Sequence, residues 1–134
     1  MVENLCFSVG SVHCAIPLSH VDAVHHMVQI EMNSGRPAWE AGHINRHGSM
    51  LQVISLFPVL GLNTPALSSD ELLIIIRAGD REIALRATTI EGVRNIAPDP
   101  ETASPWIKSD LPEFLTFQGT TLILQDPACL IAAL

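Results

Sequence analysis

Residues 42–56 read Gly-His-Ile-Asn-Arg-His-Gly-Ser-Met-Leu-Gln-Val-Ile-Ser-Leu. Two apolar runs flank a polar turn that contains Gly48. This pattern predicts a β-hairpin whose second strand, Met50 to Ile54, continues into the segment Leu56 to Leu60. The other predicted elements can be arranged around this central hairpin.

A first hairpin is predicted from Leu5–Val9 and Val12–Ile16, which alternate in hydrophobicity around the two-residue turn Gly10-Ser11. The turn fixes the register and gives these facing pairs: Val9 and Val12, Phe7 and Cys14, Cys6 and Ala15. Alternation then puts Cys14 on the buried face of the sheet and Cys6 on the opposite face. A disulfide between them would have to cross the sheet, so we expect free thiols. The odd number of cysteines, three, agrees with a reducing compartment.

Between these hairpins, Ser19 can cap a single helical turn from His20 to His25, with Val21 and Val24 on one face. After the central hairpin, Phe57–Leu62 is expected to form one helical turn that ends at Gly61. The later predictions are a strand pair at 72–78 and 83–88, a strand at 90–96 with a bulge at Gly92, a proline-rich surface loop at 97–112, a last strand pair at 114–117 and 121–125, and a terminal turn at 128–134.

No predicted helix is longer than about two turns, and short strands of this kind favour small closed barrels, since closure removes their exposed edges. The chain of 134 residues is long enough for one ordinary domain. We therefore predict an all-β fold in a single domain, 1–134. Its two barrel-like halves are expected to be joined where the chain crosses between them, near residues 63–70.

The central hairpin resembles the Gly-Val-Ile-Asn-Leu-Arg-Gly signature, followed by an apolar strand and Asp-Leu, of the CheW-type chemotaxis coupling domain. The matching positions are Gly42, Ile44, Asn45, Gly48, Val53, Ile54 and Leu56. The resemblance extends to the first hairpin, to Val21–Val24 as the short Val-x-x-Val/Ile segment, and to a strand that ends in Ile90-Glu91-Gly92-Val93. It implies two small SH3-like β-barrel subdomains packed together.

Several polar positions depart from that family pattern. His47 stands where a basic residue usually precedes the second glycine, and the arginine is Arg46. Gln52 replaces a frequent Pro, and Ser55 and Thr88 replace Asp. Ala23 stands where Glu is common.

The resemblance implies a non-catalytic adaptor that couples the cytoplasmic tip of a chemoreceptor to the regulatory domain of a CheA-type histidine kinase. Such an adaptor needs an apolar groove for helix side chains and an apolar strand edge that pairs with a homologous barrel. The candidate partner-binding residues are Val21, Val24, Asn45, Arg46, His47 and Leu51, with Arg46 and His47 expected as exposed donors at the hairpin tip. An alternative keeps the fold but scaffolds another motility or signalling pathway, or self-associates.

Composition excludes several other classes. The net charge of −7 and the absence of a basic run disfavour nucleic acid, and no apolar run approaches the length that spans a bilayer. The N-terminus lacks the pattern of a signal peptide, so we expect a cytoplasmic protein without direct membrane insertion. Charged residues make up only 16% of the chain, against about a quarter in typical proteins, which leaves apolar surface for partners.

Six histidines are the only hint of a metal site or a reaction. His43 and His47 lie four residues apart across a turn, but no Cys-x-x-Cys or His-Glu-x-x-His motif accompanies them. There is also no Gly-x-Ser-x-Gly elbow and no Gly-rich phosphate loop. We therefore expect no catalytic residues, cofactor or metal. A histidine-dependent metal-binding or hydrolytic protein remains a second alternative.

Overall fold

The structure is a computed structural model and describes residues 2–32, 34–35, 37–78, 80–96, 115–118 and 121–124. These residues form ten β-strands and one short 3₁₀ turn, η1 (Leu18–His20). The strands are β1 (Val2–Val9), β2 (Val12–Pro17), β3 (Val21–His26), β4 (Glu40–Arg46), β5 (Ser49–Ile54), β6 (Leu72–Ala78), β7 (Arg81–Ala87), β8 (Thr89–Ile96), β9 (Leu115–Gln118) and β10 (Thr121–Leu124). The prediction of an all-β fold is confirmed.

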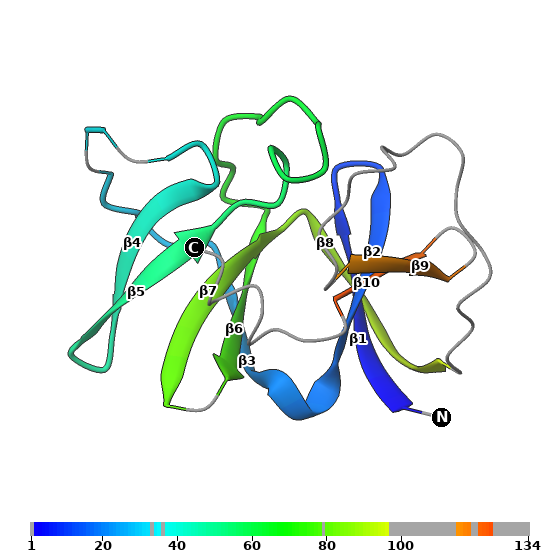
Figure 1. Ribbon diagram of the computed structural model, residues 1–134. Coiled ribbons are helices and arrows are strands. Elements are labelled where there is room, and N and C mark those ends of the chain that lie inside the picture. Colours follow the sequence, from blue (N-terminus) through cyan, green and yellow to red (C-terminus); the bar gives the residue numbers. More distant parts are fainter. Residues whose placement is uncertain are drawn as a thin grey trace.

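The strands form two five-stranded sheets that lie side by side (Figure 1). The first sheet has the order β8-β1-β2-β10-β9, and the second has the order β3-β6-β7-β5-β4. The chain passes from the first sheet to the second through η1 and returns between β7 and β8. The segment 63–70 joins β5 to β6 within the second sheet, so our prediction that the chain crosses there is wrong.

The first hairpin has the register predicted from its turn, with Val9 opposite Val12, Phe7 opposite Cys14 and Cys6 opposite Ala15. β1 also pairs with β8, and β10 pairs with β2 in parallel. The pairing of β1 with β8 shifts where Cys6 faces Gly92 and Phe7 faces Ile90, which leaves Glu91 as the extra residue of a bulge. The bulge predicted at Gly92, whose φ is +121°, is therefore confirmed.

The helical turn predicted for His20–His25 is wrong, because residues 21–26 form the strand β3, which pairs with β6. The spacing of Val21 and Val24 suggested a helical face. In the structure Val21 and Ala23 are half-buried, whereas Asp22 and Val24 are exposed. This alternation has the two-residue period of a strand at the edge of a sheet.

The central hairpin consists of β4 and β5, with His47 and Gly48 as its two turn residues. Both have positive φ values, 53° and 81°. This is the backbone requirement of a type I′ turn, which matches the twist of the flanking strands. The side-chain oxygen of Asn45 accepts a hydrogen bond from the N–H of Gly48 at 3.1 Å.

Gly42 lies where the chain at Glu31 approaches β4. Glu31 and His43 exchange two backbone hydrogen bonds of 2.9 and 2.8 Å. A Cβ atom at Gly42 would lie 2.3 Å from the carbonyl oxygen of Glu31 and 2.4 Å from Cγ2 of Ile30, and the φ of Gly42 is +145°. Only glycine fits at this position.

Two clusters of buried apolar side chains form the core. The first joins the two sheets and includes Phe7 and Ile16 from the first sheet with Ile74 and Leu85 from the second. The second cluster lies on the opposite face of the second sheet, and its members are Ile30, Ile44, Leu51, Val53, Leu73, Ile75 and Ala84. Strand β6 is buried on both faces, which explains why residues 72–76 form an unbroken apolar run.

The remaining predicted elements are the turn at 57–62, the last strand pair and two segments near the C-terminus. The segment Phe57–Leu62 forms a turn, closed by a hydrogen bond of 2.8 Å from the N–H of Leu62 to the carbonyl of Phe57, with Gly61 at a φ of +73°. The last strand pair is confirmed as β9 and β10, within two residues of the expected bounds. The loop predicted at 97–112 and the turn predicted at 128–134 lie outside the described residues.

Candidate partner-binding surface and the two ends of the second sheet

Strand β7 places Glu82, Ala84 and Arg86 on one face of the second sheet, because alternate residues of a strand share a face. Ala84 belongs to the second core cluster. Glu82 and Arg86, on either side of it, each form an ion pair. The second core cluster is therefore apolar in the middle and carries an ion pair toward each end of β7.

At the end of the second core cluster that lies near the β4–β5 turn, Arg46 is the centre of a polar network. Its Nη1 atom lies 3.2 Å from Oδ2 of Asp22 and 3.0 Å from Oε1 of Glu82, and its Nε atom lies 3.5 Å from Nε2 of His25. Glu82 also accepts a hydrogen bond of 2.9 Å from Nη2 of Arg77. β3 and β4 are the two outermost strands of the second sheet. Arg46 therefore links the two edges and curls the sheet toward a barrel.

The structure changes the roles expected for two of the predicted contact residues. Arg46 is not an exposed donor, because its side chain is 19% exposed and pairs with two carboxylates. Leu51 is 4% exposed and belongs to the second core cluster. Asn45 and His47 are exposed at the hairpin tip, with Met50, which is 55% exposed, opposite Asn45.

An exposed apolar strip follows β3 and the segment after it. Its members are Val24, Val28 and Met32, which are 39%, 51% and 54% exposed. Val21 is half-buried and packs against the first core cluster. Among the described strands β3 pairs only with β6, so its other edge carries no ladder partner there. Val24 is thus the predicted contact residue that combines exposure with an unpaired strand edge.

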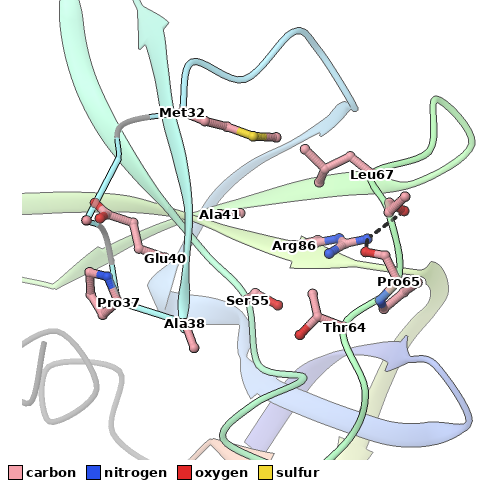
Figure 2. A pocket seen from close by; sticks show the side chains of 12 residues that line it. Met32, Pro37, Ala38, Glu40, Ala41, Ser55, Thr64, Pro65, Leu67 and Arg86 are labelled. Atoms are coloured by element: carbon pink, nitrogen blue, oxygen red, sulfur yellow. Dashed lines mark hydrogen bonds between the residues drawn. The ribbon is translucent and has the colours of Figure 1, made fainter.

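At the opposite end of the second core cluster, Arg86 and Glu71 form a buried ion pair. Nε and Nη2 of Arg86 lie 2.5 and 3.0 Å from the two carboxylate oxygens of Glu71. Nη2 also donates to the carbonyl oxygens of Pro65 and Ala66 at 2.9 and 3.0 Å, and the guanidinium carbon lies 5.1 Å from the centre of the Phe57 ring. The two side chains are 2% and 8% exposed. Arg86 also lines a pocket, together with residues of β4 and of the segments before β4 and after β5 (Figure 2).

Cys6 and Cys14 are free and buried. Burial raises the pKa of the Cys14 thiol from 9.0 to about 12, and burial likewise raises the pKa of Cys6. The expectation of free thiols is confirmed for these two. Since the thiolate is the reactive form, neither side chain is suited to nucleophilic chemistry near neutral pH.

Apart from His25, which contacts Arg46 in the network above, three histidines have described side-chain contacts, each with a different residue. Nδ1 of His13 lies 2.9 Å from Glu91, Nε2 of His43 lies 3.3 Å from Glu40, and Nδ1 of His20 lies 3.3 Å from the carbonyl of Arg77. Within the described part of the chain, no three side chains of His, Cys, Asp or Glu are grouped so that they could hold a metal ion. The same residues contain no helix long and apolar enough to cross a membrane.

The comparisons with known proteins agree with this architecture. The model of the CheW-like domain family matches residues 3–132. The chain belongs to the CheW-like domain family. The crystal structure of the scaffolding protein TtCheW from Thermoanaerobacter tengcongensis matches with a TM-score of 0.73 and 20% sequence identity, over 92% of this chain and 82% of that one. No significant match was found among curated proteins. The two-sheet architecture is therefore the CheW fold of two SH3-like subdomains.

Two features of the second sheet were missed from the sequence. The ion pair of Arg86 with Glu71 had a signal, since Arg86 interrupts a strand whose other residues from 83 to 87 are apolar. The network of Arg46 had no local signal, because its partners Asp22 and Glu82 lie 24 and 36 residues away along the chain.

Proposed function

We propose that this CheW-like protein is a non-catalytic adaptor in chemotaxis-type signal transduction. It bridges the cytoplasmic tip of a chemoreceptor and the regulatory domain of a CheA-type histidine kinase, and it acts in the cytoplasm. The observation that carries the proposal is the match of the CheW-like family over residues 3–132, on a chain whose fold is that of a scaffolding protein.

The kinase contact is assigned to the apolar strip and the outer edge of β3. An edge strand presents unpaired N–H and C=O groups that a strand of another barrel can use to extend the sheet. Val24, Val28 and Met32 add exposed apolar area next to that edge. Backbone pairing then supplies affinity, and the side chains supply selectivity for the partner.

The receptor contact is assigned to the tip of the central hairpin. Asn45, His47 and Met50 are exposed there and combine polar groups with an apolar side chain. Arg46 supports this surface from beneath by holding the hairpin against β3 and β7. Its role is to position the tip.

The proposal is tested by titrating the chain with the regulatory domain of a co-encoded CheA-type kinase, using calorimetry. Val24→Asp places a charge in the apolar strip, so we expect the dissociation constant to rise by about tenfold or more. Val93→Asp is the matched control, since Val93 is a 50% exposed apolar residue on the first sheet. Its binding is expected to remain as in the wild type.

The result that would contradict the kinase assignment is an absence of saturable binding at about 100 μM, which is weaker than micromolar signalling contacts. An equal loss of kinase binding in Val24→Asp and Val93→Asp would show that the contact does not lie on β3. With kinase binding absent and the fold intact, the alternative of a CheW-like scaffold for another motility or signalling pathway becomes the leading one. Sedimentation of the chain alone then tests self-association.

A further inference from the structure

A pocket lined in part by Arg86 lies at the end of the second core cluster opposite the hairpin tip, and of its lining residues only Met32 is assigned to an adaptor contact. Its volume is about 460 Å³, which is within the usual range for small-molecule sites. Its apolar walls are formed by Met32, Pro37, Ala38, Ala41, Pro65 and Leu67. These residues come from the connection between β3 and β4, from β4 itself and from the segment between β5 and β6, so the pocket is enclosed by parts of the chain far apart in sequence (Figure 2).

One polar group at this pocket is left without a partner. The hydroxyl of Ser55 has no hydrogen bond to any described residue, and Ser55 is 1% exposed. Figure 2 shows its oxygen pointing into the space bordered by Thr64 and Arg86. Buried hydroxyl groups nearly always have a hydrogen-bond partner, so an unpaired one that borders a pocket is available to a molecule that enters it.

Among the described lining residues, the charged side chains Glu40 and Arg86 already have hydrogen-bond partners. Arg86 is paired with Glu71 through two hydrogen bonds. The carboxylate of Glu40 accepts a hydrogen bond of 3.1 Å from Gln52 and lies 3.3 Å from Nε2 of His43. A charged ligand would leave water and have to compete with these existing hydrogen bonds of the described residues, which is unfavourable in a partly enclosed site.

We propose that this pocket binds an uncharged small molecule with an apolar body and one hydroxyl or carbonyl group. The apolar body contacts the walls, and the polar group forms a hydrogen bond with the hydroxyl of Ser55. The inference shares only Met32 with the residues assigned to the adaptor contacts, and its test does not depend on binding of the kinase or the receptor.

The test is a titration of the full chain, followed by amide chemical shifts, with three probes that share one aromatic ring: benzyl alcohol, benzoate and benzylammonium. We expect saturable shifts for benzyl alcohol at millimolar concentration, centred on Ala41, Ser55, Thr64 and Leu67. Benzoate and benzylammonium are expected to give shifts at least fivefold weaker at the same concentration. No saturable shift with any probe, or equal binding of a charged probe, would overturn the proposal.

Variants identify the pocket and its polar contact. Ser55→Ala should weaken benzyl alcohol binding at least threefold while leaving the melting temperature of the free protein unchanged or higher, because the unpaired hydroxyl is removed. Leu67→Trp and, separately, Ala66→Phe should fill the pocket and abolish the shifts, whereas Val93→Trp on the first sheet should not. Wild-type affinity in Ser55→Ala would refute the hydrogen bond, and wild-type affinity in both filling variants would refute the site.

Discussion

The guanidinium group of Arg46 on β4 lies 3.2 Å from the carboxylate of Asp22 on β3, and this contact joins the two edge strands of the second sheet. The same guanidinium group also contacts Glu82 on β7 at 3.0 Å. The hairpin tip that carries Asn45 and His47 is thereby fixed relative to β3, which carries Val24. The two proposed partner surfaces are thus held in one rigid arrangement.

Removal of the guanidinium group of Arg46 should destabilise the protein more than removal of a similar group at the surface. We expect Arg46→Met to lower the free energy of unfolding by about 1–3 kcal/mol, because Glu82 and Asp22 then lose a partly buried partner. Arg77→Met is the matched control, since Arg77 pairs with the same Glu82 but its side chain is 61% exposed. Its cost should be clearly smaller, because water screens an exposed ion pair. Equal losses of unfolding free energy in the two variants, measured by urea denaturation, would contradict the role of Arg46 in linking the two edge strands.

The buried pair of Arg86 and Glu71 should respond differently to single and double substitution. Arg86→Met leaves the carboxylate of Glu71 buried without its cation, and we expect a loss of about 3–5 kcal/mol in unfolding free energy. The double variant Arg86→Met/Glu71→Leu removes both charges and should be more stable than the single one. Urea denaturation of the two variants checks this, and a double variant less stable than Arg86→Met would show that the charges are not coupled.

The close approach of Glu31 to β4 makes Gly42 irreplaceable. Gly42→Ala would place its Cβ 2.3 Å from a backbone oxygen, so the chain at residues 30–31 would have to move away. We expect a loss of stability of more than about 3 kcal/mol. Gly48→Ala is the control, because Gly48 also has a positive φ but a Cβ there meets no atom within 4 Å. Its cost should be near 1 kcal/mol, as expected for backbone strain alone. Similar thermal stabilities for the two variants would refute the steric argument.

Cys14 should make the protein less stable at alkaline pH. Its thiol ionises near pH 9.0 when exposed in the unfolded chain but only near pH 12 in the folded protein. The unfolded state therefore releases a proton first as the pH rises, and folding stability falls by about 1.4 kcal/mol per pH unit within this window. The absence of tyrosine leaves few other groups to titrate there. Cys14→Val should show a shallower decline between pH 9 and 11 in urea unfolding, and an unchanged slope would contradict the burial effect.

The local sequence pattern was sufficient to predict structure where the residues in contact are close in sequence. The register of the first hairpin followed from the turn Gly10-Ser11, and the bulge in β8 followed from Gly92. Leu51 could also have been assigned correctly, because alternation places it on the same face as Val53 in the second core cluster. The prediction that Leu51 contacts a partner overlooked that alternation.

Other features depend on contacts between distant segments. The spacing of Val21 and Val24 fits both a helix and a short strand, and only the pairing of β3 with β6 decides between them. The points at which the chain crosses between the two sheets depend on the pairing of β8 with β1, and the paired residues are more than 80 positions apart in sequence. The pocket at Arg86 and the unpaired hydroxyl of Ser55 likewise arise where three separate segments meet, so no single stretch of sequence predicts them.

The central claim is that one molecule of this chain binds two partners at the same time. The most direct measurement is sedimentation velocity on a mixture of the kinase regulatory domain, a soluble fragment of the receptor tip and this protein. The account predicts a ternary complex that forms only when all three are present and that is lost with Val24→Asp but retained with Val93→Asp. Mutually exclusive binding, in which each partner displaces the other from this protein, would contradict the bridging function.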